Sequence, residues 1–286
     1  MMINKRVHKF GIKENLFGVE YSLEKVNADL PILLFVNAGI VPKFGPNHLY
    51  VFLCYKLAEI GYTSFRFDLS GIGESNEDNE IVKTEDYQVN EIKMATDYIL
   101  NYHSKQKIII IGLCSGAYEG LRYSLIDERV EGLVFINGSV INYKKMNLLS
   151  DAADSSIKMR YYKKNILNIN KWLKIAKGNS KIFKYILRKV SKNNISDFRK
   201  EKKHKNFDFK ENYLNNIIVK NLKTLFIFTE GSIFYDYFVL SNSLSKIKNK
   251  ENMEVIYLQG IDHTFTTHSS REHLFIKIIK WLQYNE

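Results

Sequence analysis

Short apolar runs alternate along the chain with longer segments in which apolar residues recur at helical spacing. Runs without polar alternation, such as residues 31–36 and 107–111, are typical of strands buried on both faces of a parallel sheet. The predicted strands of this sheet are residues 31–36, 62–67, 107–111, 130–137, 224–229 and 253–258. Predicted helices are residues 47–60, 84–102 and 270–283. This succession of strands and helices predicts an α/β fold with a parallel sheet.

Two parts of the chain depart from this pattern. Residues 7–12 and 16–24 are two short runs, of which the second, LFGVEYSLE, alternates, and they predict an antiparallel pair of strands. From 141 to 216 strands and helices no longer alternate. Helix-compatible stretches there, such as 161–177 and 182–192, are rich in Lys, Asn and aromatic residues. We expect an inserted helical segment there.

The strand at 107–111 runs into Gly112-Leu113-Cys114-Ser115-Gly116 and then into a predicted helix. Small residues on both sides of position 114 allow a sharp turn, so the segment predicts a strand, a turn and a helix with one side chain exposed at the apex. That side chain is Cys114. The other cysteine, Cys54, lies in an apolar helical stretch and is predicted to be part of the core.

The spacing Gly-x-Cys-x-Gly resembles the nucleophile elbow of the α/β-hydrolase superfamily. A turn of the form Asp-x-x-Gly-x-Gly-x-Ser at 68–75 and Gly-x-Asp-His-x-Phe at 260–265, just past the last strand, are similar to further pieces of the same family. The resemblance implies a mostly parallel central sheet flanked by helices, with an inserted helical cap. It divides the chain into a core at 1–140, a cap at 141–216 and a second part of the core at 217–286.

The resemblance implies that Cys114 is the nucleophile, since it stands at the apex where most members carry serine. Ser115 is the alternative, but it lies one place past the apex. Esterase-like and thioesterase-like members with an elbow cysteine make the exchange compatible with catalysis. Because a helix N-terminus and a nearby histidine stabilise negative charge, we expect a lowered thiol pKa at Cys114.

The family places its general base just past the last strand, which implies His263. Two histidines nearby are alternatives, but His268 lies too far past the strand and His273 is predicted on the surface of the closing helix. Asp262 adjoins His263 and is predicted to stabilise the loop.

The acid of the triad follows the strand at 224–229 in this family, and the place where it is expected holds Ser232. Asp236 is the first candidate for the acid and Glu230 the second. The acid holds the imidazole in one tautomer, so a displaced carboxylate could still serve.

Backbone N–H groups after the strand at 31–36 and at the elbow imply an oxyanion hole. The candidate donors are Ser115 and the amides of Ala38, Gly39 and Ile40. Asp68 and the glycines of its turn are predicted to be structural.

The net charge of +11 is concentrated in one segment: residues 141–206 hold 19 Lys or Arg and 4 Asp or Glu, so the rest of the chain is net acidic. Such a basic cap is either a solvated surface or a binding site for an acidic acyl carrier protein, coenzyme A or an anionic lipid surface. Nucleic acid is not expected, because no binding motif accompanies the charge.

Several classes are not favoured by the sequence. The N-terminus lacks an apolar leader segment and no apolar run is long enough to span a bilayer, so a cytoplasmic protein is expected. Two cysteines do not suggest a disulfide framework. The histidines are scattered and no residues have metal-ligand spacing, so neither a metal nor a cofactor is expected.

The resemblance therefore implies an acyl hydrolase, an esterase or thioesterase, with a Cys-His-Asp type triad. An acyltransferase that moves an acyl group from a carrier protein or coenzyme A thioester to a hydroxyl or amine is the alternative, and a peptidase has the same triad. A catalytically inactive binding protein with the same fold is the alternative of another class.

Overall fold

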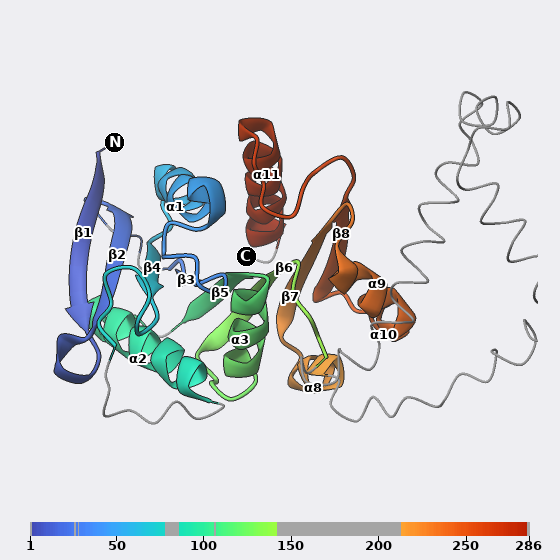
Figure 1. Ribbon diagram of the computed structural model, residues 1–286, viewed down its shortest axis with the longest axis horizontal. Coiled ribbons are helices and arrows are strands. Elements are labelled where there is room, and N and C mark those ends of the chain that lie inside the picture. The colour runs from blue at the N-terminus through green and yellow to red at the C-terminus, as the bar shows by residue number, and fades with distance from the viewer. Residues whose placement is uncertain are drawn as a thin grey trace, which may run out of the picture. The chain divides into compact units, whose positions relative to one another are not determined.

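The computed structural model describes residues 2–25, 27, 29–77, 86–105, 107–141 and 213–284 (Figure 1). In this part of the chain, eight strands form one sheet. They are β1 (Ile3–Phe10), β2 (Leu16–Leu23), β3 (Ile32–Val36), β4 (Ser64–Asp68), β5 (Ile108–Leu113), β6 (Val130–Ile136), β7 (Lys223–Thr229) and β8 (Met253–Leu258). All six strands predicted for the parallel sheet are confirmed within a few residues.

The order of the strands in the sheet is β1-β2-β4-β3-β5-β6-β7-β8. β1 pairs with β2 and β2 with β4 in antiparallel fashion, and every other neighbouring pair is parallel. The predicted antiparallel pair at the N-terminus is thus confirmed, although β1 begins and ends earlier than the predicted 7–12. β1 lies at the edge of the sheet and several of its polar side chains are exposed, so its sequence has no apolar run that would mark its bounds. Its register follows from its pairing with β2.

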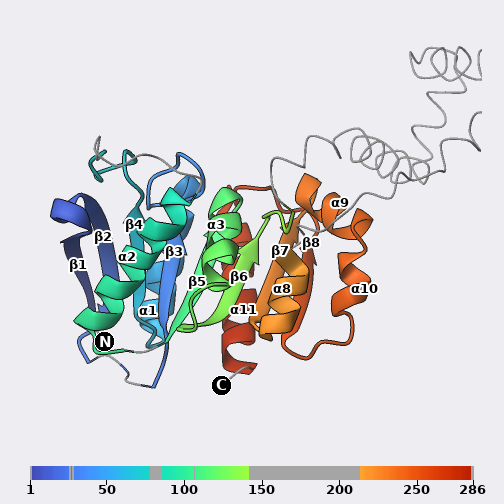
Figure 2. The ribbon, with the colours of Figure 1, turned by 90° about the horizontal axis from the view of Figure 1, so that it is seen from below.

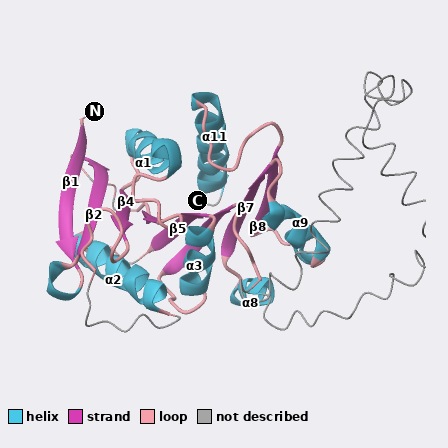
Figure 3. Ribbon diagram, in the orientation of Figure 1, coloured by secondary structure: helices cyan, strands magenta, loops and turns pink. Residues whose placement is uncertain are grey.

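Helices cover both faces of the sheet (Figures 1 and 2). α1 (Leu49–Glu59) and α11 (His268–Tyr284) lie on one face, whereas α2 (Tyr87–Tyr102), α3 (Ser115–Ser124) and α8 (Tyr213–Lys220) lie on the other. Two short helices, α9 (Ile233–Leu240) and α10 (Ser243–Ile247), lie between β7 and β8 in the chain. Figure 3 distinguishes these helices from the strands by colour. Single turns of 3-10 helix, η1 (Ile12–Glu14) and η2 (Pro46–His48), precede β2 and α1.

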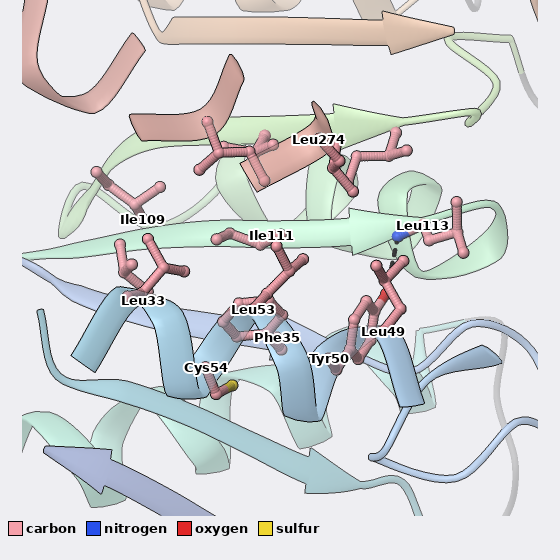
Figure 4. Packing of buried hydrophobic residues seen from close by; sticks show 14 of the residues in the cluster. Leu33, Phe35, Leu49, Tyr50, Leu53, Cys54, Ile109, Ile111, Leu113 and Leu274 are labelled. Atoms are coloured by element: carbon pink, nitrogen blue, oxygen red, sulfur yellow. Dashed lines mark hydrogen bonds between the residues drawn. The ribbon is translucent and has the colours of Figure 1, made fainter. Parts of the chain in front are cut away.

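The core between the sheet and the helices α1 and α11 is apolar (Figure 4). Phe35 of β3 and Ile111 of β5 are fully buried there against Leu53 of α1 and Leu274 of α11. Cys54 is also fully buried in this cluster, and burial raises the pKa of its thiol to about 12. The prediction that Cys54 is a core residue is confirmed.

The predicted cap, 141–216, falls almost entirely on residues 142–212, which lie outside the described residues. Its end belongs to the described part: α8 begins at Tyr213, whose N–H donates to Val140 O at 3.0 Å. Leu214 and Ile217 of α8 are buried. The cap, its boundaries and its basic surface therefore remain predictions.

The parallel arrangement fixes where the candidate residues lie. The carboxyl ends of β3, β5, β6, β7 and β8 are all at one edge of the sheet, because neighbouring strands among these five are parallel. The segments that follow them include Ala38, Cys114, Glu230 and His263. Residues that are far apart in the sequence are thereby brought to a common edge.

Candidate active site

Cys114 lies at the apex of the turn between β5 and α3, with φ 57° and ψ −119°. A positive φ is uncommon for a residue with a side chain and needs support from its surroundings. The flanking glycines supply room for it: a Cβ at Gly112 would lie 2.4 Å from Gly116 O, and a Cβ at Gly116 would lie 2.3 Å from Asn37 O. Only glycine fits at these two positions, and the predicted strand, turn and helix are confirmed.

The thiol of Cys114 is half-buried. Burial raises its pKa, and the hydrogen bond from the Ser115 N–H, which favours the thiolate, only partly offsets this effect. The expectation of a lowered thiol pKa is therefore wrong. The helix N-terminus acts in the expected direction, but loss of hydration outweighs it.

The segment after β3 approaches the elbow closely. Gly39 has φ 62°, and a Cβ built on it would lie 3.5 Å from Ser115 Oγ. The turn is closed by a hydrogen bond from Val41 N–H to Ala38 O at 3.2 Å. Ala38 and Gly39 are partly exposed, and Ile40 is 90% exposed. The structure thus brings the segment that carries the predicted oxyanion donors next to Ser115.

A buried polar network lies beneath this segment. Asn37 Nδ2 donates to Val41 O at 2.9 Å, and its Oδ1 accepts from Leu69 N–H at 2.9 Å. Asp68, which is fully buried, accepts from the backbone N–H and the Nζ of Lys43 at 2.5 and 2.6 Å. The prediction that Asp68 is structural is confirmed, because its carboxylate ties the end of β4 to the segment after β3.

Tyr50 of α1 connects the carboxyl ends of β3 and β5. Its hydroxyl donates to Val36 O at 3.0 Å. It also accepts from Leu113 N–H at 3.0 Å (Figure 4). Leu113 is the residue before Cys114, so this fully buried tyrosine supports the backbone of the elbow. The sequence offered no signal for this role beyond an aromatic residue on a predicted buried helix.

The loop after β8 carries His263 in a constrained turn. Asp262 accepts hydrogen bonds from the backbone N–H and the hydroxyl of both Thr264 and Thr266. These bonds outweigh the opposing effect of burial and lower the pKa of Asp262 to about 2. The prediction that Asp262 stabilises the loop is confirmed.

His263 is half-buried, and its ring lies 6.4 Å from that of Phe234 on α9, measured between centroids. Burial lowers the pKa of His263, against a smaller opposing effect of the Asp262 charge. The two histidines considered as alternatives are exposed: His268 is the first residue of α11, 3.8 Å from Glu272, and His273 lies on the surface of the same helix. The structure places neither of them in a buried setting comparable to that of His263.

The two candidate acids lie in different settings. Asp236 is buried in the first turn of α9, two residues after Phe234, so the two side chains project about 160° apart around the helix axis. Glu230 directly follows β7, and its Oε2 accepts from Gly260 N–H at 2.8 Å. Its own N–H is within hydrogen-bonding distance of Leu258 O and Ile261 O. Glu230 thus fastens the loop that carries His263, and Phe234 of α9 makes a ring contact with the imidazole.

Asn137, which the sequence analysis did not single out, lies at the carboxyl end of β6 and is fully buried. Its Oδ1 accepts from Thr229 N–H at 2.9 Å, and its Nδ2 donates to Thr229 Oγ1 at 3.0 Å and to His263 O at 3.3 Å. The available signal was an Asn-Gly pair directly after a buried strand, where asparagine tolerates a positive φ.

No group of His, Cys, Asp and Glu side chains suited to holding a metal ion occurs within the described ranges. No helix among those residues is long and apolar enough to cross a bilayer. A small cavity of about 40 Å³ lies at the opposite edge of the sheet, lined by Tyr62, Trp281 and Lys223 among others. It has no part in the arrangement around Cys114.

Comparison with known proteins agrees with this architecture. A sequence model described as alpha/beta hydrolase fold matches residues 44–168. The sequence has no significant match among curated proteins.

Three solved structures show the extent of the likeness. An esterase of Pyrococcus furiosus has a TM-score of 0.61 at 14% identity, over 99% of this chain and 91% of the other. A proline iminopeptidase of Mycobacterium smegmatis has a TM-score of 0.58 at 14% identity, over 98% of each chain. An alpha-beta serine hydrolase homologue from Coxiella burnetii has a TM-score of 0.56 at 11% identity, over 98% of each chain. At these identities the likeness concerns the fold alone, and the chain has the α/β-hydrolase fold.

Proposed function

We propose that this protein is an acyl hydrolase, an esterase or thioesterase, that works through a covalent acyl-enzyme on Cys114 with His263 as general base. The observation that carries the proposal is the backbone of Cys114: a residue with a positive φ directly after β5, between two glycines that admit no side chain. A strained backbone conformation at such a position lowers the stability of the fold, and it is typical of a turn that carries a catalytic nucleophile.

The first half of the reaction forms the acyl-enzyme. Cys114 Sγ attacks the acyl carbonyl carbon while the His263 imidazole takes the thiol proton. The resulting oxyanion accepts hydrogen bonds from the Ser115 N–H and from an N–H of the segment that contains Ala38 and Gly39. The bond to the leaving oxygen or sulfur then breaks, and the imidazolium gives its proton to the leaving group.

The second half releases the acyl group. Water attacks the acyl carbonyl of the thioester on Cys114, and His263 takes a proton from the water and returns it to the departing sulfur. A hydroxyl or amine in place of water would make the same site an acyltransferase. The sequence-based reason to consider this alternative is the basic segment at 141–206, which suits an acidic carrier protein or coenzyme A as donor.

Both ionisation effects favour a neutral thiol beside a neutral imidazole. Burial raises the pKa of Cys114 and lowers the pKa of His263, so an ion pair between them is disfavoured before the substrate binds. The proton is therefore transferred during attack rather than beforehand. Asp236 remains the first candidate for the third member of the triad, and Glu230, which holds Gly260, remains the second.

The proposal is tested by intact-protein mass spectrometry. The wild-type protein and the variants Cys114→Ala and Ser115→Ala are each mixed with a panel of small acyl esters and acyl thioesters. Esters are the first choice of probe, because an esterase shares the fold. We expect an added acyl mass on the wild type and on Ser115→Ala, and none on Cys114→Ala. The donor that labels fastest names the substrate class.

The same panel of acyl donors distinguishes an enzyme from an inactive binding protein with the same fold. If no donor labels the wild type, and an alkylating reagent modifies Cys114 no faster than the buried Cys54, the covalent mechanism is excluded. Thioester turnover that slows steeply with added salt would support a charged carrier as donor, whereas turnover that is indifferent to salt would count against it.

A further inference from the structure

The side-chain amide of Asn137 makes contact with two different segments at the carboxyl edge of the sheet. On one side it exchanges hydrogen bonds with the backbone and the hydroxyl of Thr229, at the end of β7. On the other it reaches His263 O at 3.3 Å. Asn137 has φ 48°, a conformation that asparagine adopts more readily than most residues. Its side chain is 0% exposed, and the bonds to Thr229 are fully buried.

The backbone beside Asn137 contacts the elbow. Ile136 O accepts from Cys114 N–H at 2.9 Å, and the N–H of Asn137 donates to Ile227 O at 2.8 Å. Two consecutive residues at the end of β6 therefore contact the candidate nucleophile and the candidate base. One strand end thereby carries the hydrogen-bonded connection from Cys114 to the loop of His263.

We propose that Asn137 is a positioning residue that fixes the backbone of His263 relative to Cys114; this inference rests on the proposed acyl transfer. A general base works only when its accepting atom lies within hydrogen-bonding distance, about 3 Å, of the atom that carries the proton. The loop after β8 has other attachments, from Glu230 to Gly260 and Ile261 and from Asn47 to Thr264. None of these bonds is made to His263 itself. The buried amide of Asn137 contacts His263 directly, through a hydrogen bond to its carbonyl oxygen at 3.3 Å.

Two substitutions separate positioning from simple support. Asn137→Asp keeps the shape and the acceptor oxygen for the Thr229 N–H but replaces the amide donor by a carboxylate oxygen, which repels His263 O. Thr229→Val removes the hydroxyl that the same amide contacts, in an equally buried place, and leaves the bond to His263 intact. The second variant is therefore the matched control.

The readout is the hydrolysis of p-nitrophenyl butyrate, with kcat and KM measured separately, beside the thermal unfolding midpoint. We expect Asn137→Asp to lower kcat about ten- to hundredfold with KM within about twofold, because misplacing a catalytic group by about 1 Å costs up to about a hundredfold. Thr229→Val should keep kcat and KM within about twofold of the wild type. If Asn137→Asp does not fold, Asn137→Gly takes its place, since glycine adopts a positive φ freely and lacks the amide.

Hydrogen exchange gives a second readout that needs no substrate. Amides in 259–266 should exchange faster in Asn137→Asp than in the wild type and be unchanged in Thr229→Val. Equal losses of kcat in both variants, or a loss in KM alone, would overturn the positioning role. Normal turnover of Asn137→Asp with an active wild type would overturn this inference alone, whereas failure of any ester or thioester to acylate the wild type would overturn the proposed function.

Discussion

Two side chains, Cys114 and His263, share the same electrostatic setting: each is half-buried, and in each burial favours the uncharged form. The thiol pKa is raised and the imidazole pKa is lowered. At neutral pH the imidazole is therefore free to accept a proton, and the thiol still holds the one that it must lose. General-base assistance, rather than a stored thiolate, is the chemistry that this setting supports.

The first prediction concerns the pH dependence of turnover. His263 acts as a base only when it is neutral, so kcat/KM for p-nitrophenyl butyrate should rise with pH through the pKa of His263. Because burial lowers that pKa, the rise should be centred below the ordinary histidine value. Activity should be lost only as the pH falls through this lowered value.

The variant His263→Gln provides the control for this profile. It should lose about a hundred- to ten-thousandfold in kcat/KM, the usual contribution of a general base, and the rise on the acid side should disappear. A profile that keeps its acid limb in this variant would assign the titration to another group. Exposed His273 on α11 offers a matched substitution, His273→Gln, for which no change is expected.

The role of a residue could be predicted from the sequence where it depends on neighbouring positions, and not where it depends on contacts with distant parts of the chain. The elbow was predictable because Gly112, Cys114 and Gly116 lie within five positions, and their spacing alone specifies the turn. The thiol pKa was predicted in the wrong direction, since burial at Cys114 depends on segments far away in the chain. Asn137 was missed for the same reason: its bond to His263 spans 126 positions.

Among the elements, β3 and β5 are held together at their carboxyl ends by α1. Tyr50 contributes its hydroxyl to both strands, and Gly116 lets the start of α3 pack directly on the backbone that follows β3. The elbow is therefore supported from both faces of the sheet. Loss of either support should lower the free energy of unfolding, although neither change removes a side chain that is proposed to take part in catalysis.

The second prediction tests the support from α1. Tyr50→Phe removes the hydroxyl and leaves the buried N–H of Leu113 without this acceptor, so the free energy of unfolding should fall by about 1–3 kcal/mol. Chemical denaturation measures this change. Tyr55→Phe on the same helix, where the side chain is 42% exposed, should change it by less than about 0.5 kcal/mol. Equal effects of the two changes would refute the support by Tyr50.

The third prediction tests the support from α3. Gly116→Ala would place a Cβ 2.3 Å from Asn37 O and 2.5 Å from Val36 O, and backbone atoms cannot move aside cheaply. We expect a loss of about 1–3 kcal/mol in the free energy of unfolding, as is usual for overpacking. Ser115→Ala, at the neighbouring position, should stay within about 0.5 kcal/mol. A stable Gly116→Ala protein with a normal denaturation midpoint would contradict the close approach.

Strands such as β3 and β5 were predicted well, because a strand that is buried on both faces consists of an unbroken run of apolar residues. The edge strand β1 was displaced by several residues, since its exposed polar side chains give no such signal. The acid-bearing region was the least predictable. Helix geometry places the side chains of Asp236 and Phe234 on different sides of α9, but which side faces His263 depends on how the helix packs on the sheet.

At the scale of the whole molecule, the antiparallel edge of the sheet is fastened by a buried charge. Glu20 of β2 is fully buried, and its Oε2 lies 3.0 Å from His8 Nε2 and 3.2 Å from His103 Nε2. Ser22 donates to its other oxygen at 2.7 Å, and Arg6 lies at 3.8 Å. Burial alone would raise the pKa of Glu20, but the nearby His103 and the hydrogen bonds with His8 and Ser22 together hold it well below its ordinary value.

The fourth prediction concerns acid stability. Because the folded protein lowers the pKa of Glu20, this residue stabilises the fold fully above its unfolded pKa near 4.5, and this contribution is lost as the pH falls below that value. The urea midpoint of Glu20→Gln should therefore be lower than that of the wild type at pH 7, and it should fall less steeply as the pH is lowered from about 5 to about 2. Glu254→Gln, an exposed position on β8, should follow the wild type throughout. Parallel curves for Glu20→Gln and the wild type would contradict this role.

The central claim concerns one covalent bond, between Cys114 Sγ and an acyl group. Tandem mass spectrometry of peptides from the wild-type protein, quenched in acid during turnover of p-nitrophenyl butyrate, tests it most directly. The account predicts a butyryl group on the Cys114 sulfur in the peptide that contains the elbow. A butyryl group on Ser115, or unmodified elbow peptide during active turnover, would contradict it.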